Sequence, residues 1–138
     1  MRSWPPTCCT VIADAWTDGI DCYGLFIDPP LGCVGMTELQ VPESGRPALV
    51  GIRPMTRVSR AVEKGETQGF MKVLIDAQTN QILGAAILGV GGDEVVHGIL
   101  DVMYAKAPHT VIPRAVHIHP TVSEPIPTML ADLKPLAG

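Results

Sequence analysis

The residues best suited to chemistry lie in one short stretch, His117-Ile118-His119-Pro120-Thr121-Val122-Ser123-Glu124. A carboxylate that accepts a hydrogen bond from one imidazole nitrogen fixes the tautomer and makes the other nitrogen a better base. His119 and Glu124 are five residues apart, so a turn between them would allow contact. We interpret them as a candidate acid/base pair.

The same stretch also fits a structural role. Thr121-x-x-Glu124 has the spacing of a capping box, in which the two side chains satisfy backbone N–H groups at a helix start. From the residues alone, this interpretation is favoured over chemistry.

A third interpretation is a metal site. On a strand, His117 and His119 would point the same way and could share a zinc ion with Glu124 or His97. This would make the protein a small metal-dependent or hydrolytic enzyme that uses His117, His119 and Glu124. The H-x-H pattern is a weak signal without a further ligand cluster, and His97 and His109 are otherwise expected to be surface or packed histidines.

The elements that position this stretch begin with β-rich segments. Residues 23–27 predict a strand, 28–32 a turn, and 34–36 a continuation of the strand. A brief helical turn at 37–40 is expected to end early because of Pro42, and 48–52 resumes an extended pattern. The clearest hairpin joins 69–76 to 81–89 through a polar connector.

Helical periodicity starts after residue 92. Val96, Ile99, Leu100 and Met103 share one face, acidic residues lie at the N-terminal end, and Pro108 ends the helix. Residues 109–116 are ambiguous, and a last helix is predicted over 123–133. Strands first and helices last indicate an α+β fold, with an antiparallel β-sheet flanked by helices.

The loop Gly89-x-Gly91-Gly92-Asp93-Glu94 follows a predicted strand and opens a helix, as phosphate-binding loops do. Its two acidic residues lie where an anion would bind, so we interpret it as a tight strand-to-helix turn.

Length, net charge and composition exclude several classes of function. The 138 residues suit one domain, and the formal net charge of -4 offers no basic surface for nucleic acid. No apolar run of about 18 residues could span a membrane, and the start lacks a signal-peptide pattern, so we expect a cytoplasmic protein. The cysteines, Cys8, Cys9, Cys22 and Cys33, form no C-x-x-C motif and are expected to be buried or incidental thiols.

Four segments carry a family resemblance: DPPLGCVGMTE (28–38), ETQGFMKVLID (66–76), ILGAAILGVGGDEVVHGILDVMYA (82–105) and VHIHPTVSE (116–124). In order and without a large gap, residues 22–136 resemble the C-terminal dimerisation domain of FAD-dependent pyridine nucleotide-disulfide oxidoreductases. The most similar branch contains mercuric reductase, dihydrolipoamide dehydrogenase and the reactive-chlorine-resistance flavoproteins. The H-P-T-x-S-E motif is the most specific part of the likeness.

The resemblance implies a homodimer whose active sites lie between two chains. His119 would act as acid/base at the partner's flavin-side disulfide, and Glu124 would orient it. The likeness also implies a cis His119–Pro120 bond, whereas the general preference for an X-Pro bond is trans.

Departures from the family pattern are as informative as the match. The chain has no G-x-G-x-x-G loop, no redox C-x-x-x-x-C pair and no NAD(P) domain. We therefore expect it to bind neither FAD nor NAD(P) alone, to be inactive alone, and to pair with a second copy or an intact reductase subunit. Cys33 stands where arginine is common, and Pro125 where leucine is usual, which puts the position of Glu124 in question.

Residues 1–19 match nothing in the family, and residues 1–21 are left unassigned and are expected to be a disordered or out-of-frame segment. With suitable codons, a shifted reading of MRSWPPTCCTVIADAWTDG gives AVVAANLLYGDRRRVDGR, which is similar to family sequence just before this domain. We hypothesise a truncated or frameshifted remnant, which sequencing the upstream DNA would test.

Overall fold

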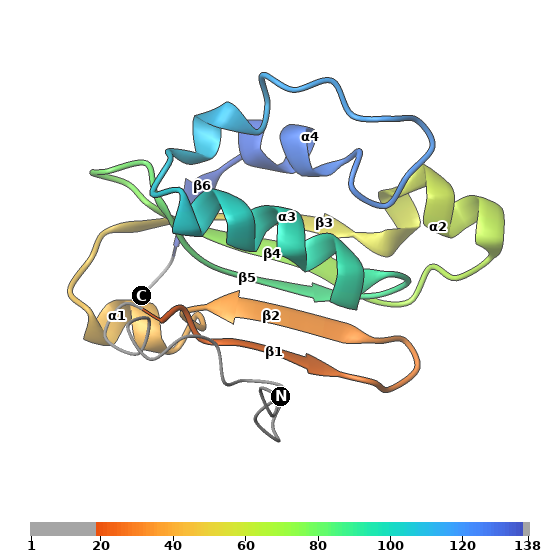
Figure 1. Ribbon diagram of the computed structural model, residues 1–138, viewed down its shortest axis with the longest axis horizontal. Helices are drawn as coiled ribbons and strands as arrows, with labels where there is room; N and C mark the ends of the chain where they lie inside the picture. The colour runs from red at the N-terminus through yellow and green to blue at the C-terminus, as the bar shows by residue number, and fades with distance from the viewer. Residues whose placement is uncertain (1–18, 137–138) are drawn as a thin grey trace, which may run out of the picture.

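The computed structural model describes residues 19–136. An antiparallel β-sheet forms the centre of the fold (Figure 1). The hypothesis of an out-of-frame segment falls almost entirely outside these residues. Within them the sheet has six strands in the order β1-β2-β5-β4-β3-β6, and all neighbours are antiparallel. The strands are β1 (Cys22–Leu25), β2 (Leu31–Gly35), β3 (Ala48–Pro54), β4 (Phe70–Asp76), β5 (Ile82–Leu88) and β6 (Lys134–Pro135). The predicted α+β class with an antiparallel sheet is confirmed.

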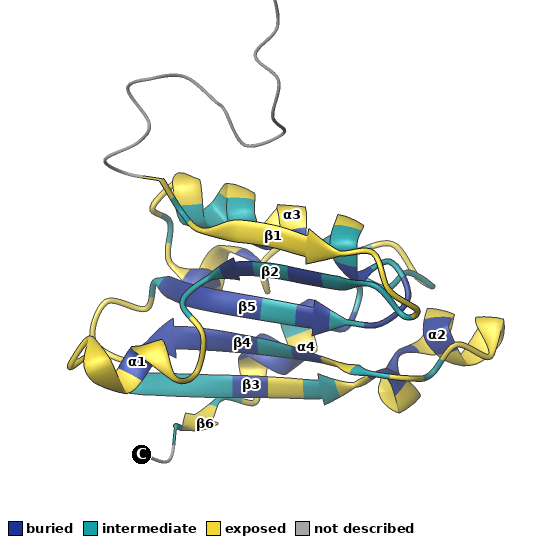
Figure 2. Cartoon of the chain, turned by 90° about the horizontal axis from the view of Figure 1, so that it is seen from below, coloured by how far each residue is buried: buried dark blue, intermediate teal, exposed yellow. Residues whose placement is uncertain are grey.

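Four helices and two 3₁₀ turns are described around the sheet. The helices are α1 (Gln40–Glu43), α2 (Ser59–Lys64), α3 (Gly92–Tyr104) and α4 (Ile126–Ala131); the 3₁₀ turns are η2 (Met55–Arg57) and η3 (His109–Val111). Helices α3 and α4 lie together on one face, behind the sheet in Figure 2. Among these residues, no helix is long and apolar enough to cross a membrane.

The predicted hairpin is the centre of the fold. In β4, Met71, Val73 and Ile75 alternate onto the helix-covered face and are almost fully buried. Their side chains pack in the main core with the apolar face of α3, where Val96 and Ile99 are buried. Burial of this strand and helix therefore follows from their period-2 and period-3.6 patterns.

Close contact between α3 and the sheet requires two glycines. A Cβ atom on Gly32 would lie 2.5 Å from the carbonyl oxygen of Gly92, and one on Gly92 would lie 2.3 Å from the carbonyl oxygen of Ile87. Both distances are far below van der Waals contact, so glycine lets the helix approach β2 and β5. The Gly89–Glu94 loop thus works as a tight turn, as its acidic residues suggested.

The other face of the sheet is only partly covered. A second, smaller cluster forms there where α1 meets the sheet, and its buried members are Val41, Leu74 and Leu83. Within residues 19–136, no helix lies on the rest of this face, toward β1 and β2 (Figure 2).

Several boundaries differ from the sequence prediction. Pro42 does not end the helical turn early but lies within α1, because proline is tolerated in a first helical turn. The last helix is shorter than 123–133: it begins at Ile126, after Pro125, and ends at Ala131. Residues 109–116 contain only η3, and neither α2 nor β6 was predicted.

Candidate active-site loop and open sheet face

The loop that carries the candidate acid/base pair runs from η3 to α4. Its His119–Pro120 bond is cis, as the family resemblance implied. The hydroxyl of Thr121 donates a hydrogen bond to the carbonyl oxygen of Ile118, 2.8 Å away, and so closes the turn around Pro120. This turn sends the chain back on itself between His119 and Glu124.

His119 and Glu124 meet across that turn. Their Nδ1 and Oε1 atoms are 2.7 Å apart, and the side chains are 64% and 32% exposed. Because a carboxylate accepts hydrogen bonds, this contact places a proton on Nδ1 and leaves Nε2 of a neutral ring with a free lone pair. The geometry suits an imidazole that takes up and returns a proton at Nε2.

The capping-box prediction is wrong. Glu124 binds the His119 ring instead of a backbone N–H group, and the Thr121 hydroxyl donates to a carbonyl. No side chain among the described residues caps α4, which begins only at Ile126. Pro125 did not displace Glu124 from His119.

The proposed three-ligand metal site is not formed. Residues 117–119 are not on a strand, and within residues 19–136 no group of three His, Cys, Asp or Glu side chains is placed to hold a metal ion. His97 is exposed on α3, and His109 is buried with Nδ1 3.0 Å from the carbonyl oxygen of Asn80. His117 is partly buried, and its Nδ1 atom has no hydrogen-bond partner among the described residues.

The loop with a phosphate-binding pattern does not suit a dinucleotide phosphate. In this turn the N–H of Gly92 already donates to the carbonyl oxygen of Gly89. Asp93 and Glu94 occupy the first turn of α3, where their charge opposes an anion. The residues described here therefore do not fit FAD or NAD(P) at that loop.

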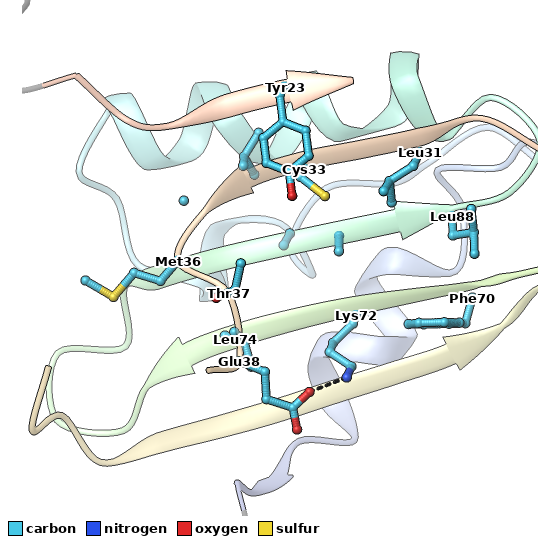
Figure 3. A pocket seen from close by; sticks show the side chains of 14 residues that line it. Tyr23, Leu31, Cys33, Met36, Thr37, Glu38, Phe70, Lys72, Leu74 and Leu88 are labelled. Atoms are coloured by element: carbon cyan, nitrogen blue, oxygen red, sulfur yellow. Dashed lines mark hydrogen bonds and ion pairs between the residues drawn. The ribbon is translucent and has the colours of Figure 1, made fainter. Parts of the chain in front are cut away.

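The position of a second surface was not predicted from the sequence. On the uncovered sheet face, a shallow pocket of about 320 Å³ is lined by Tyr23, Cys33, Phe70, Lys72 and Leu88, among others (Figure 3). The hydrogen bond with the Cys33 side chain raises the pKa of Tyr23. Of the cysteines expected to be buried or incidental thiols, Cys22 is exposed and Cys33 is partly buried, and Cys8 and Cys9 lie outside the described residues.

Fold and loop together define an α+β domain that presents an oriented histidine. Residues 23–130 match the family described as pyridine nucleotide-disulphide oxidoreductase, dimerisation domain. The chain belongs to this family.

Relatives of this domain are much longer proteins. The probable pyridine nucleotide-disulfide oxidoreductase RclA of Escherichia coli is 34% identical over 112 residues, which are 81% of this chain and 25% of that protein. Dihydrolipoyl dehydrogenase 3 of Pseudomonas putida is 38% identical over 100 residues, 72% of this chain and 22% of that protein. A solved structure of the HOCl-induced flavoprotein disulfide reductase RclA from E. coli superposes with a TM-score of 0.79 at 33% identity, over 81% of this chain and 26% of that one. The chain thus spans about a quarter of the length of these relatives.

Proposed function

We propose that this domain supplies the His119–Glu124 pair as an acid/base unit to the active site of a partner reductase subunit, and that it does not turn over alone. The observation that carries this proposal is the 2.7 Å contact between Nδ1 of His119 and Oε1 of Glu124 on an exposed loop. Membership in a dimerisation-domain family supports delivery to a second chain. The partner is a second subunit of the reductase type, which supplies the flavin, the pyridine nucleotide site and the redox disulfide.

In the proposed role, Nε2 of His119 accepts the proton of a thiol on the partner and leaves a thiolate. The imidazolium then returns that proton to the sulfur that leaves when a disulfide is broken. Glu124 keeps the accepting nitrogen turned away from the domain and stabilises the imidazolium through its charge. Electron transfer itself belongs to the flavin of the partner.

The orienting role of Glu124 is testable on the isolated chain. By ¹⁵N NMR at about pH 8, where histidine is neutral, we expect His119 to be protonated on Nδ1. Glu124→Gln should shift His119 toward the Nε2–H tautomer, because a carboxamide can satisfy either ring nitrogen. Glu66→Gln, at an exposed carboxylate, should leave the His119 tautomer unchanged.

The acid/base role requires the rest of a reductase. We would replace the dimerisation domain of E. coli RclA with residues 22–136 and measure NAD(P)H-dependent reduction. His119→Gln should lower kcat about 10²–10⁴-fold while flavin content and dimer mass stay unchanged. Glu63→Gln, at an exposed residue of α2, is the control; equal kcat for His119→Gln and this control would refute the acid/base role.

A further inference from the structure

Arg53 lies at the end of β3 that meets the candidate acid/base loop. Helix α4 covers β3 at Gly51, where an added Cβ atom would lie 2.9 Å from the carbonyl oxygen of Met129. From Met129 the chain continues into β6, whose Lys134 pairs with Val50. Helix α4 therefore runs opposite to β3, and its N-terminal end lies toward Arg53 (Figure 1).

The acid/base pair lies just before that end of α4. Glu124 is five residues before Met129, or about 7.5 Å at helical rise, and Arg53 is two residues beyond Gly51, or about 7 Å along the strand. Both displacements have the same direction. Because residues two apart in a strand point to the same face, the Arg53 side chain projects on the face that α4 covers. Arg53 therefore lies beside the loop that holds Glu124 and His119.

Arg53 is anchored by a neutral group, not by an opposite charge. Its Nε–H donates to the carbonyl oxygen of Arg57, 3.3 Å away, and the residue is partly buried. Within residues 19–136, neither Arg53 nor Arg57 forms an ion pair with a carboxylate, whereas Arg46 and Arg60 each do so. Both positive charges therefore remain available to an anion.

Arg57 brings the second positive charge to the same region. It is exposed at the end of η2 and precedes Val58, which is fully buried. Val122 of the acid/base loop packs against the main core cluster, of which Val58 is a member. Two positive charges, at Arg53 and Arg57, thus lie on the element that adjoins this loop.

We propose that Arg53 and Arg57 form a recognition site for anionic disulfide substrates, namely disulfides that carry carboxylates. The proposal rests on the proposed function, since it takes His119 to act on a disulfide that reaches the active site between this domain and its partner. A guanidinium binds a carboxylate through two parallel N–H···O bonds, and the bond from Nε to Arg57 leaves both Nη groups of Arg53 for this contact. Arg57 contributes mainly through its charge, because it is exposed.

Substrate charge tests this proposal in the chimera of E. coli RclA that carries residues 22–136. The probes are 3,3′-dithiodipropionate, a dianion, bis(2-hydroxyethyl) disulfide, which is neutral, and cystamine, a dication. Arg53→Gln should lower kcat/KM for the dianion at least about 10-fold, mainly through KM, because the carboxylate contact is made in both the ground state and the transition state. The neutral disulfide should change less than about 2-fold, and cystamine should become a better substrate.

Two further variants separate recognition from general charge. Arg57→Gln should reduce kcat/KM for the dianion about 3-fold at low salt and have no effect at about 0.5 M salt, because exposed charges are screened. Lys64→Gln, which removes an equal charge from the last turn of α2, is the control and should leave the ratios of kcat/KM between the probes unchanged. Equal losses for all the probes with Arg53→Gln would overturn the proposal, because the arginine would then support the structure or pair with a carboxylate of the partner.

The 138-residue chain provides a second measurement that needs no turnover. In ¹⁵N NMR spectra, 3,3′-dithiodipropionate at millimolar concentration should shift the Nε–H signal of Arg53, and bis(2-hydroxyethyl) disulfide should not. No shift with the dianion, or equal shifts with both disulfides, would overturn the proposal. Neither readout depends on proton transfer: if His119→Gln retained kcat, the acid/base role would fail while the preference for the dianion could still hold.

Discussion

Asp76 allows a prediction whose size and pH dependence both follow from the structure. Its carboxylate ends β4 and is buried, with 4% of the residue exposed. Oδ1 accepts hydrogen bonds from the backbone N–H groups of Gln78, at 2.8 Å, and Thr79, at 3.1 Å. Oδ2 lies 3.5 Å from Nη1 of Arg46, whose side chain is 48% exposed. The two backbone hydrogen bonds, and to a smaller extent Arg46, lower the pKa of Asp76.

Asp76→Asn tests the contribution of the charge while preserving the shape of the side chain. Hydrogen bonds to a charged group contribute about 1.5–3 kcal/mol each, against about 0.5–1.5 kcal/mol for neutral ones. Loss of the charge should therefore weaken each of the two bonds by about 1 kcal/mol, and the free energy of unfolding should fall by about 2 kcal/mol near pH 7. Arg46→Gln should cost less than about 1 kcal/mol, because exposed ion pairs contribute little.

The pH dependence has a fixed sign. Since folding lowers the pKa of Asp76, its ionised form stabilises the protein above the unfolded pKa, which is near 4. This stabilisation is lost as the pH falls through the folded pKa. The difference in unfolding free energy between wild type and Asp76→Asn should thus be largest near neutral pH and should shrink below about pH 4.

Urea unfolding followed by circular dichroism at about pH 7, 5 and 3 measures these differences. Comparison of the two variants with wild type at each pH separates the contribution of Asp76 to the free energy of unfolding from the contributions of other groups that titrate. A difference for Asp76→Asn that does not change with pH would refute the reasoning. So would an equal loss for Arg46→Gln at neutral pH, because the arginine would then be the main partner.

Two further predictions concern glycine residues at the contact between α3 and the sheet and on the exposed side of α3. Gly32→Ala should lower the free energy of unfolding by about 1–3 kcal/mol, measured by urea titration, because its Cβ would lie 2.5 Å from a backbone oxygen of α3. Gly98→Ala should instead raise it by about 0.5–1 kcal/mol, since a Cβ there meets nothing within 4 Å on an exposed helical position. If both substitutions changed the free energy of unfolding by a similar amount, Gly32 would not be needed for the close approach of α3 to the sheet.

Elements with strong local patterns were predictable from the sequence. In β4 the buried Met71, Val73 and Ile75 repeat with period 2, and β5 is apolar throughout and buries its first four residues. In α3 the buried Val96 and Ile99 follow the helical period. Burial of one whole face makes any other register or helix phase unfavourable, so the pattern alone indicates the structure.

The elements that were missed depend on tertiary contacts. Helix α2 spans six residues and buries only Ala61, so its sequence carries no repeated apolar signal. Strand β6 spans two residues and exists because Lys134 and Pro135 pair with β3. The position of the uncovered sheet face was missed for a related reason: Phe70 and Lys72 both lie on that face of β4, but the pattern of one strand does not reveal whether a layer covers it.

The contact between His119 and Glu124 could not be predicted from the spacing of the motif alone. The motif allows Glu124 two partners, a backbone N–H at a helix start or the imidazole five residues earlier, and both satisfy a carboxylate. The residue at which α4 begins determines which of the two partners Glu124 binds. Because Ile126 is the first helical residue and its N–H donates to Ser123, Glu124 precedes the helix and its carboxylate remains available to His119. Pro125, which lacks an N–H donor, occupies the position before the helix without requiring a capping partner. A residue that departs from the family pattern is therefore compatible with the acid/base geometry, and the Glu124→Gln tautomer experiment tests that geometry directly.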